Sequence, residues 1–204
     1  MTEQPSESTL AARLEDLDSR LRLAGARIAD HWRPGADRTR VDEAFRSVGL
    51  EAPDEVANWF GWHDGTDAIA PGAPVMSKPE NLLFGSLLTM TLEQAKSLRT
   101  EHWALLRESG WPLITRAESW YPLLILDGTS MLWCVDCAGE GSVLAPMCIL
   151  DPWADETSGP DVSFPSIASF VAAAVQLFDE GLARPNPDKP GVVEVDRSRV
   201  SGFW

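Results

Sequence analysis

Residues 120–150, WYPLLILDGTSMLWCVDCAGEGSVLAPMCIL, contain three apolar runs that are separated by turn-forming residues. The runs are Trp120–Leu126, Met131–Cys137 and Ser142–Leu150, joined by an Asp-Gly-Thr link and by a glycine-rich link. Short β-prone runs with such links predict an antiparallel meander. Side chains alternate between the two faces of a strand, and both faces of the middle run are largely apolar. We therefore expect a sheet that is covered on both sides and forms the centre of the protein.

The composition is that of a globular protein. The chain has 204 residues, of which 44% are hydrophobic, enough to build one domain with a core. It has no apolar run long enough to cross a membrane, and its polar, acidic first residues do not resemble a secretion signal. Three cysteines without framework spacing are typical of a reducing compartment. These features predict a cytoplasmic protein.

An apolar stripe follows one face of a helix expected from Thr9 to Trp32. Its members step along the chain by three or four residues: Leu10, Leu14, Leu17, Leu21, Ala24 and Ile28. The stripe predicts packing against the rest of the domain, with a short coiled-coil contact between two copies as the alternative. Arg33-Pro34-Gly35-Ala36 is expected to break the helix.

Further elements are predicted on both sides of the meander. We expect helices over 37–48, from Pro53 to a close at His63-Asp64-Gly65, and over 92–108, the last with a capping box between Thr91 and Gln94. A strand is expected over 81–90. A final helix begins at Pro165 or Ser166 and ends at Gly181. Residues 185–191 read as a linker, and 192–195 as a candidate edge strand.

The net charge of −14 is unevenly distributed along the chain. Residues 1–49 are nearly neutral, with nine acids and eight bases. Between Arg116 and Arg184 there are ten acids and no lysine or arginine; the acids are Glu118, Asp127, Asp136, Glu140, Asp151, Asp155, Glu156, Asp161, Asp179 and Glu180. Such a field repels nucleic acid and attracts a basic partner. A surface that serves only solubility is the alternative.

No motif predicts a catalytic or metal site. Cys134 and Cys137 have CxxC spacing, but they lie within an alternating strand and therefore face opposite sides, where they cannot chelate or pair. His31, His63 and His102 are far apart, and His63-Asp64 at a helix end is more typical of a cap than of a base. Asp64 and Asp67 lack the other ligands of a calcium loop. No cofactor is predicted.

Tryptophan is unusually frequent, with nine in the chain against one tyrosine. The stretch 59–153 is especially rich in them and includes Trp59, Trp62, Trp111, Trp120, Trp133 and Trp153. Most are expected in the core, but interfaces also favour tryptophan. One or two of them exposed beside acids would indicate a binding surface.

The order of several short motifs resembles the SUKH superfamily. Its opening is similar to Arg33-Pro34-Gly35-Ala36, a short helix, a turn at Pro53, and the run Trp59–Gly65. Its sheet is similar to Glu118–Leu123 (ESWYPL), the turn Asp127-Gly128, Leu132–Asp136 (LWCVD), and Gly141-Ser142-Val143. The likeness covers about residues 33–183; Ala52 departs from the leucine usual before the proline, and the two ends of the chain lie outside the pattern.

The resemblance implies a single α+β domain, a twisted antiparallel sheet flanked by helices, with an extra N-terminal helix here. It divides the chain into a helical extension (1–32), the SUKH-like domain (33–184) and a Pro-rich tail (185–204). Members of the superfamily are not known as enzymes. Many bacterial members are immunity proteins that inhibit toxins by direct binding, and fungal relatives are interaction proteins that regulate cell-wall assembly.

The leading hypothesis is therefore a non-enzymatic immunity protein that binds a basic, nuclease-type toxin and acts as a monomer or weak homodimer. Its expected contact residues lie at a helix end and in an acidic loop: Trp62, Asp64, Asp67, Asp151, Trp153, Asp155 and Glu156. Other residues are expected to support the fold: Pro53, Gly65, Trp120, Pro122 and Asp136, the last by bonding backbone amides. The alternatives are an intracellular scaffold that uses the Thr9–Trp32 stripe to dimerise or dock, and, least favoured, an enzyme.

Overall fold

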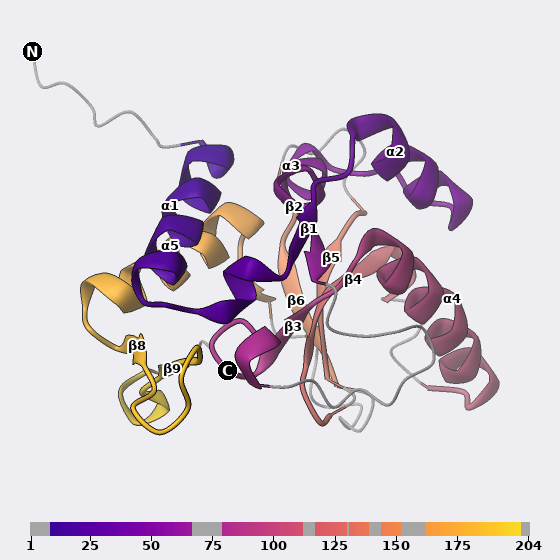
Figure 1. The fold of residues 1–204 in the computed structure, drawn as a ribbon. Helices are drawn as coiled ribbons and strands as arrows, with labels where there is room; N and C mark the ends of the chain where they lie inside the picture. The colour runs from indigo at the N-terminus through magenta and orange to yellow at the C-terminus, as the bar shows by residue number, and fades with distance from the viewer. Residues whose placement is uncertain are drawn as a thin grey trace, which may run out of the picture.

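The meander predicted over 120–150 forms the middle of a five-stranded antiparallel sheet in the computed structural model of the chain (Figure 1). The structure describes residues 9–66, 79–111, 117–129, 131–138, 144–151 and 162–200. Their elements in chain order are α1 (Leu10–Leu23), β1 (Trp32–Pro34), α2 (Arg38–Ser47), α3 (Asp54–Trp62), β2 (His63–Thr66), β3 (Leu87–Thr89), α4 (Leu92–Glu108), β4 (Trp120–Leu126), β5 (Leu132–Asp136), β6 (Met147–Leu150), β7 (Val162–Phe164), α5 (Ile167–Asp179), β8 (Ala183–Pro185) and β9 (Val193–Val195).

The sheet has the strand order β3-β4-β5-β6-β7, so each strand pairs with its neighbour in sequence. Figure 1 shows α1 and α5 on one side of this sheet and α4 on the other. Trp133 and Val135 on one face of β5 are buried, and so are Leu132 and Cys134 on the other. The prediction of a sheet covered on both sides is therefore confirmed, and the fold is a single α+β domain.

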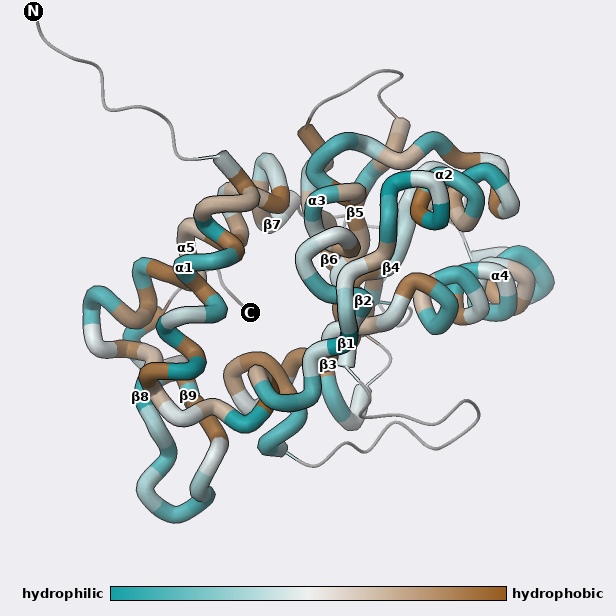
Figure 2. The backbone as a smooth tube through the Cα atoms, turned by 45° about the horizontal axis from the view of Figure 1, so that its top comes forward, coloured by the Kyte–Doolittle hydropathy of each residue, from teal (hydrophilic) through white to brown (hydrophobic). Residues whose placement is uncertain are grey.

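The N-terminal stripe is part of this core. Leu14, Leu17 and Leu21 of α1 are fully buried, and α1 lies alongside α5. Figure 2 shows hydrophobic positions alternating with hydrophilic ones along α1. Burying these three leucine side chains stabilises the folded state by about 2 kcal/mol for each. The stripe thus packs within its own chain, which removes the apolar face that the scaffold hypothesis required.

The helix itself is shorter than expected. It ends at Leu23, because Gly25 adopts a left-handed conformation with φ of 70°, and a 3-10 turn over Arg27–Asp30 follows. The expected helix break at Arg33-Pro34 proves to be strand β1, which pairs with β2. Helix α3 ends at Trp62 with His63 as its C-cap, so it closes where predicted, but His63-Asp64-Gly65 continues as strand β2 instead of forming a turn.

The strand predicted over 81–90 is mostly wrong. Only Leu87–Thr89 is extended, as edge strand β3, because Phe84 and Gly85 both have positive φ and turn the chain back from Leu83 to Leu87. The segment 192–195 does contain a strand, β9, but it pairs with β8 in a separate hairpin rather than with the main sheet. Residues 185–191, expected to be a linker, connect these two strands.

Candidate functional site

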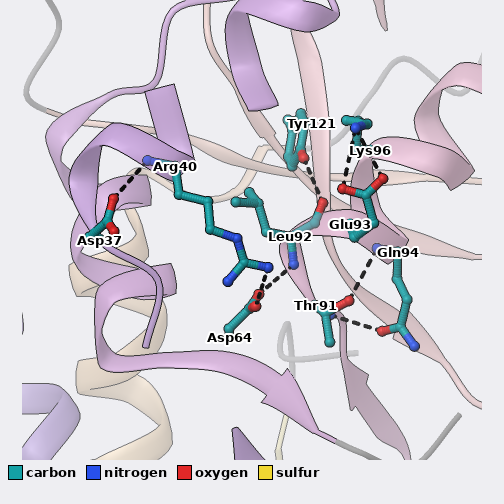
Figure 3. A network of polar contacts seen from close by, with 9 residues as sticks. All are labelled: Asp37, Arg40, Asp64, Thr91, Leu92, Glu93, Gln94, Lys96 and Tyr121. Atoms are coloured by element: carbon teal, nitrogen blue, oxygen red, sulfur yellow. Dashed lines mark hydrogen bonds and ion pairs between the residues drawn. The ribbon is translucent and has the colours of Figure 1, made fainter. Parts of the chain in front are cut away.

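Asp64 does not lie on the surface, where the sequence led us to expect a contact residue. It is fully buried in β2, and its Oδ1 accepts a hydrogen bond of 2.6 Å from the N–H of Leu92, the first residue of α4 (Figure 3). Nη2 of Arg40 approaches Oδ2 at 3.2 Å, an ion-pair contact without hydrogen-bond geometry. A buried carboxylate at a helix N-terminus satisfies an orphan N–H and the positive end of the helix dipole. Asp64 therefore has a structural role.

The same helix end carries the predicted capping box. Thr91 Oγ1 accepts from the N–H of Gln94 at 3.1 Å, and Gln94 Oε1 accepts from the N–H of Thr91 at 2.9 Å. The hydroxyl of Tyr121 on β4 donates to the carbonyl of Leu92 at 3.1 Å (Figure 3). Burial raises the pKa of Tyr121 well above its ordinary value, so this hydroxyl remains a donor. The network joins α4 to the sheet and to β2.

Gly65, expected to be structural, is required by close backbone packing. Its φ is 68°, and a Cβ there would lie 2.4 Å from the nitrogen of Thr91 and 2.5 Å from the carbonyl carbon of Met90. No side chain fits this approach, so the strand β2 can meet the start of α4 only through glycine. Pro53 is buried and forms the N-cap of α3, one residue before the position expected for it.

Glu55 is a second buried carboxylate, and sequence reasoning missed its role. It lies on α3 and is only 4% exposed. Its Oε2 accepts from the N–H groups of Ala145 at 2.9 Å and Ile167 at 3.2 Å, and its Oε1 from Ala168 at 3.1 Å. Ile167 and Ala168 open α5. One side chain thus ties α3, α5 and the segment before β6 together.

Arg99 is a buried cation that sequence reasoning also missed. Its guanidinium, on α4, donates to the carbonyls of Trp120 at 2.9 Å, Glu118 at 2.6 Å and Val48 at 3.3 Å, and lies 5.7 Å from the ring centre of Trp103. Burial lowers the pKa of Arg99. Its contacts are all with backbone carbonyls and one aromatic face, which is the arrangement of a structural brace between helix and sheet.

Three predicted support residues lie in the sheet as expected. Trp120 is buried at the start of β4. Pro122 is buried beside the point where the β4–β5 register shifts, a place that tolerates a residue without an N–H. Asp136 Oδ1 accepts from the Ala138 N–H at 2.9 Å and from the Ser119 hydroxyl at 2.6 Å, so the backbone-bonding role expected for it is present.

Cys134 in β5 and Cys137, one residue beyond its end, are both free thiols. Burial raises the pKa of Cys137 to about 12, and burial raises that of Cys134 well above its ordinary value. Since the thiolate is the reactive form, neither side chain is a nucleophile at neutral pH. Among the described residues no group of three His, Cys, Asp or Glu side chains is arranged to hold a metal ion.

Trp62, a predicted contact residue, belongs to an aromatic group at the surface that we call the aromatic corner: Trp32, Trp62 and His63. The Trp32 ring stacks on His63 with centroids 4.9 Å apart and an interplanar angle of 9°. Trp62 lies 5.1 Å from Trp32 and 4.5 Å from His63, tilted to both. All three rings are half-buried. Trp32 lies outside the tryptophan-rich stretch 59–153, so sequence reasoning missed its part in this surface.

The expected acidic loop is largely beyond the described part of the chain. Asp151, half-buried at the end of β6, is its first residue. Trp153, Asp155 and Glu156, and also Asp67 after β2, lie outside the described residues, and the role predicted for them stays a prediction. Trp62 and Asp151 are thus the two predicted contact residues that the structure places with some exposure.

Two histidines give the stability of the protein an expected pH dependence. Burial lowers the pKa of His63, against a smaller opposing effect of Asp18, and burial alone lowers the pKa of His102. Because both imidazoles bind a proton less readily in the native state than in the unfolded chain, their contribution to stability is complete above about pH 6.5, the unfolded pKa, and is lost as the pH falls below it. The urea midpoint of the wild type should be lower at about pH 5.5 than at about pH 7.5. The fall should be smaller in His63→Gln/His102→Gln; an equal fall would contradict this assignment.

No membrane-spanning helix is found among the described helices, none of which is both long and apolar enough. No protein-family model matches this chain, and comparison with curated proteins gives no significant match.

Proposed function

We propose that this chain is a protein-binding domain of the immunity type, which neutralises a basic toxin by binding to it directly. The proposal rests on one structural observation: Asp127, after β4, and Asp151, after β6, lie at the same end of the sheet. Leu126 donates its N–H to the carbonyl of Met131, and Leu150 pairs with Leu132. The two aspartates, each one residue further along, therefore flank the start of β5 from either side.

This acidic end of the sheet, defined as Asp127 and Asp151, belongs to a segment without basic residues. From Ala117 to Ala183 the chain has ten acids and no lysine or arginine. A nuclease must carry positive charge to hold phosphate. An acidic inhibitor complements that surface and accelerates association by electrostatic steering. The likeness of the sequence motifs to a superfamily rich in immunity proteins supports the same function.

Two features favour binding over catalysis. The ring of His63 lies against two indoles, and burial lowers its pKa more than the nearby Asp18 carboxylate raises it. The thiols of Cys134 and Cys137 are held protonated. The scaffold alternative loses its motivation because the leucines of the α1 stripe are buried within the domain.

The test is capture of a partner from the native host lysate by immobilised protein, at about 50 mM and about 200 mM salt. The Asp127→Asn/Asp151→Asn variant should lose the captured protein. The control, Glu43→Gln/Glu108→Gln, changes the charge equally at two exposed positions on α2 and α4 and should retain it. The captured protein should be basic, should elute as salt rises, and should arrest growth when expressed alone but not together with this chain.

Equal capture by both variants would show that the acidic end of the sheet is not the binding surface. A captured protein without toxicity would overturn the immunity function itself.

A further inference from the structure

The aromatic corner is held rigidly from below. Trp62 contacts Trp59 with ring centres 5.8 Å apart, and the buried Trp59 contacts Phe170 of α5 at 6.3 Å. The corner is also fixed from the backbone, because Trp32 pairs with Thr66 across the β1–β2 hairpin. A continuous aromatic chain therefore links the surface rings to the core. Rigid rings lose little entropy when they bind a partner.

Backbone packing beside the corner leaves the hairpin little freedom. Gly35, just after β1, lies against Gly61 of α3, where a Cβ at Gly35 would come within 1.9 Å of the Gly61 carbonyl oxygen. The N–H of Ala36 donates to the carbonyl of Phe60 at 2.8 Å. The hairpin that carries Trp32 thus packs directly against the end of the helix that carries Trp62.

A carboxylate lies at the edge of the corner. Asp18 of α1 accepts a hydrogen bond of 3.1 Å from the indole N–H of Trp32, which places a carboxylate at the edge of that ring and increases its electron density. Arg22 is ion-paired with the other oxygen of Asp18, at 2.8 Å, and its guanidinium also donates to the carbonyl of Ala29, at 3.1 Å. In the described part of the chain no lysine or arginine lies over the ring of Trp32 or Trp62.

His63 completes a neutral aromatic surface. The groups that face its ring are Asp18 and Arg22 from α1, and the backbone of Arg33 from β1. An uncharged imidazole adds a further π surface and does not repel a cation. The corner thus combines tilted π faces with a nearby carboxylate that is paired with Arg22, in a chain whose net charge is −14.

We propose that the aromatic corner receives an arginine side chain of the basic partner, which stacks its guanidinium on Trp62 and Trp32. This inference rests on the proposed function, because a basic partner supplies the arginine. Arginine is favoured over lysine because its planar, weakly hydrated guanidinium stacks on aromatic faces, whereas the ammonium of lysine is a strongly hydrated point charge. The corner gives the partner specificity, and the acidic end of the sheet gives it long-range attraction.

Calorimetric titration with two capped peptides of equal charge, hexa-arginine and hexalysine, tests the proposal. At about 150 mM salt the wild type should bind the arginine peptide about 2- to 5-fold more tightly. Trp62→Leu should bind both peptides equally. Trp62→Phe, which keeps an aromatic face, should keep much of the preference. Leu105→Ala, at a residue 61% exposed on α4, is the control and should leave the preference unchanged.

A second measurement covers the case in which Trp62→Leu does not fold. The indole N–H resonances of Trp32 and Trp62 in the wild type should shift with the arginine peptide and much less with the lysine peptide. Equal affinities for the two peptides in the wild type, without selective shifts, would overturn the proposal.

The Asp127→Asn/Asp151→Asn variant separates this proposal from the proposed function. It should weaken the binding of both peptides equally and leave the ratio of their two affinities unchanged. If the wild type binds the arginine and lysine peptides with equal affinity, arginine stacking alone is refuted. If the variant captures the native partner as well as the wild type does, the acidic docking surface alone is refuted.

Discussion

Replacing Glu55 by alanine is expected to lower the free energy of unfolding by at least about 3 kcal/mol, the largest effect of any single change considered for this protein. The substitution leaves the N–H groups of Ala145, Ile167 and Ala168 without their acceptor in the interior. Each hydrogen bond to a charged group contributes about 1.5 to 3 kcal/mol. A buried N–H group that has no acceptor destabilises the folded state further. Urea unfolding followed by circular dichroism measures the loss.

Glu55→Gln sharpens the test. An amide keeps one acceptor oxygen but turns its NH₂ toward an N–H that needs an acceptor, so an intermediate loss is expected. The control is Glu51→Ala, a nearby exposed glutamate, which should change the midpoint little. If Glu55→Ala proved as mild as Glu51→Ala, the carboxylate would not be what joins α3 to α5.

Replacing Asp64 by alanine is expected to cost about 2 to 3 kcal/mol. The first N–H of α4 would lose its partner, and the positive end of the helix would lose a buried carboxylate at 2.6 Å. Because the capping box of Thr91 and Gln94 remains, the helix should still form but attach less firmly to β2. Amide exchange at Leu92 should therefore accelerate more than exchange in β5, and urea unfolding gives the total loss.

Two variants separate the contributions at Asp64. Asp64→Asn keeps an acceptor for Leu92 and should lose only about 1 kcal/mol, from the helix dipole and the ion pair. Arg40→Ala removes only the ion pair with a half-exposed side chain, and should cost less than about 1 kcal/mol. A loss with Arg40→Ala as large as with Asp64→Ala would show that the ion pair, not the backbone hydrogen bond, is the stabilising contact.

Local patterns in the sequence predicted the elements that local interactions decide. Helix α4 begins and ends where expected, because its capping box and its apolar period are contained within its own residues. Strand β4 has its predicted bounds, and β5 differs by one residue at each end, because alternating apolar residues are bounded by Asp-Gly and glycine-rich turns. The α1 stripe predicted a buried face for the same reason, although not which helix would cover it.

The predicted contact surface was correct only in part. Trp62 lies in a half-exposed aromatic group, but its neighbour Trp32 comes from a segment that was expected to be helix and break. Asp64 was expected at the surface because Asp-Gly after a helix is typical of an exposed turn. The pairing of β1 with β2 turned that segment into a buried strand instead.

By itself the sequence determined the fold class, the central meander, the capped helix α4, and the absence of basic residues from the acidic segment, since each depends on neighbours in the chain. Only the tertiary structure decided that Glu55 of α3 caps α5, that Asp64 of β2 caps α4, that Arg99 braces the sheet, and that Trp32 meets Trp62. The physical reason is that a buried charge is stabilised by donors and acceptors far away in sequence, and no local periodicity records where those partners will lie.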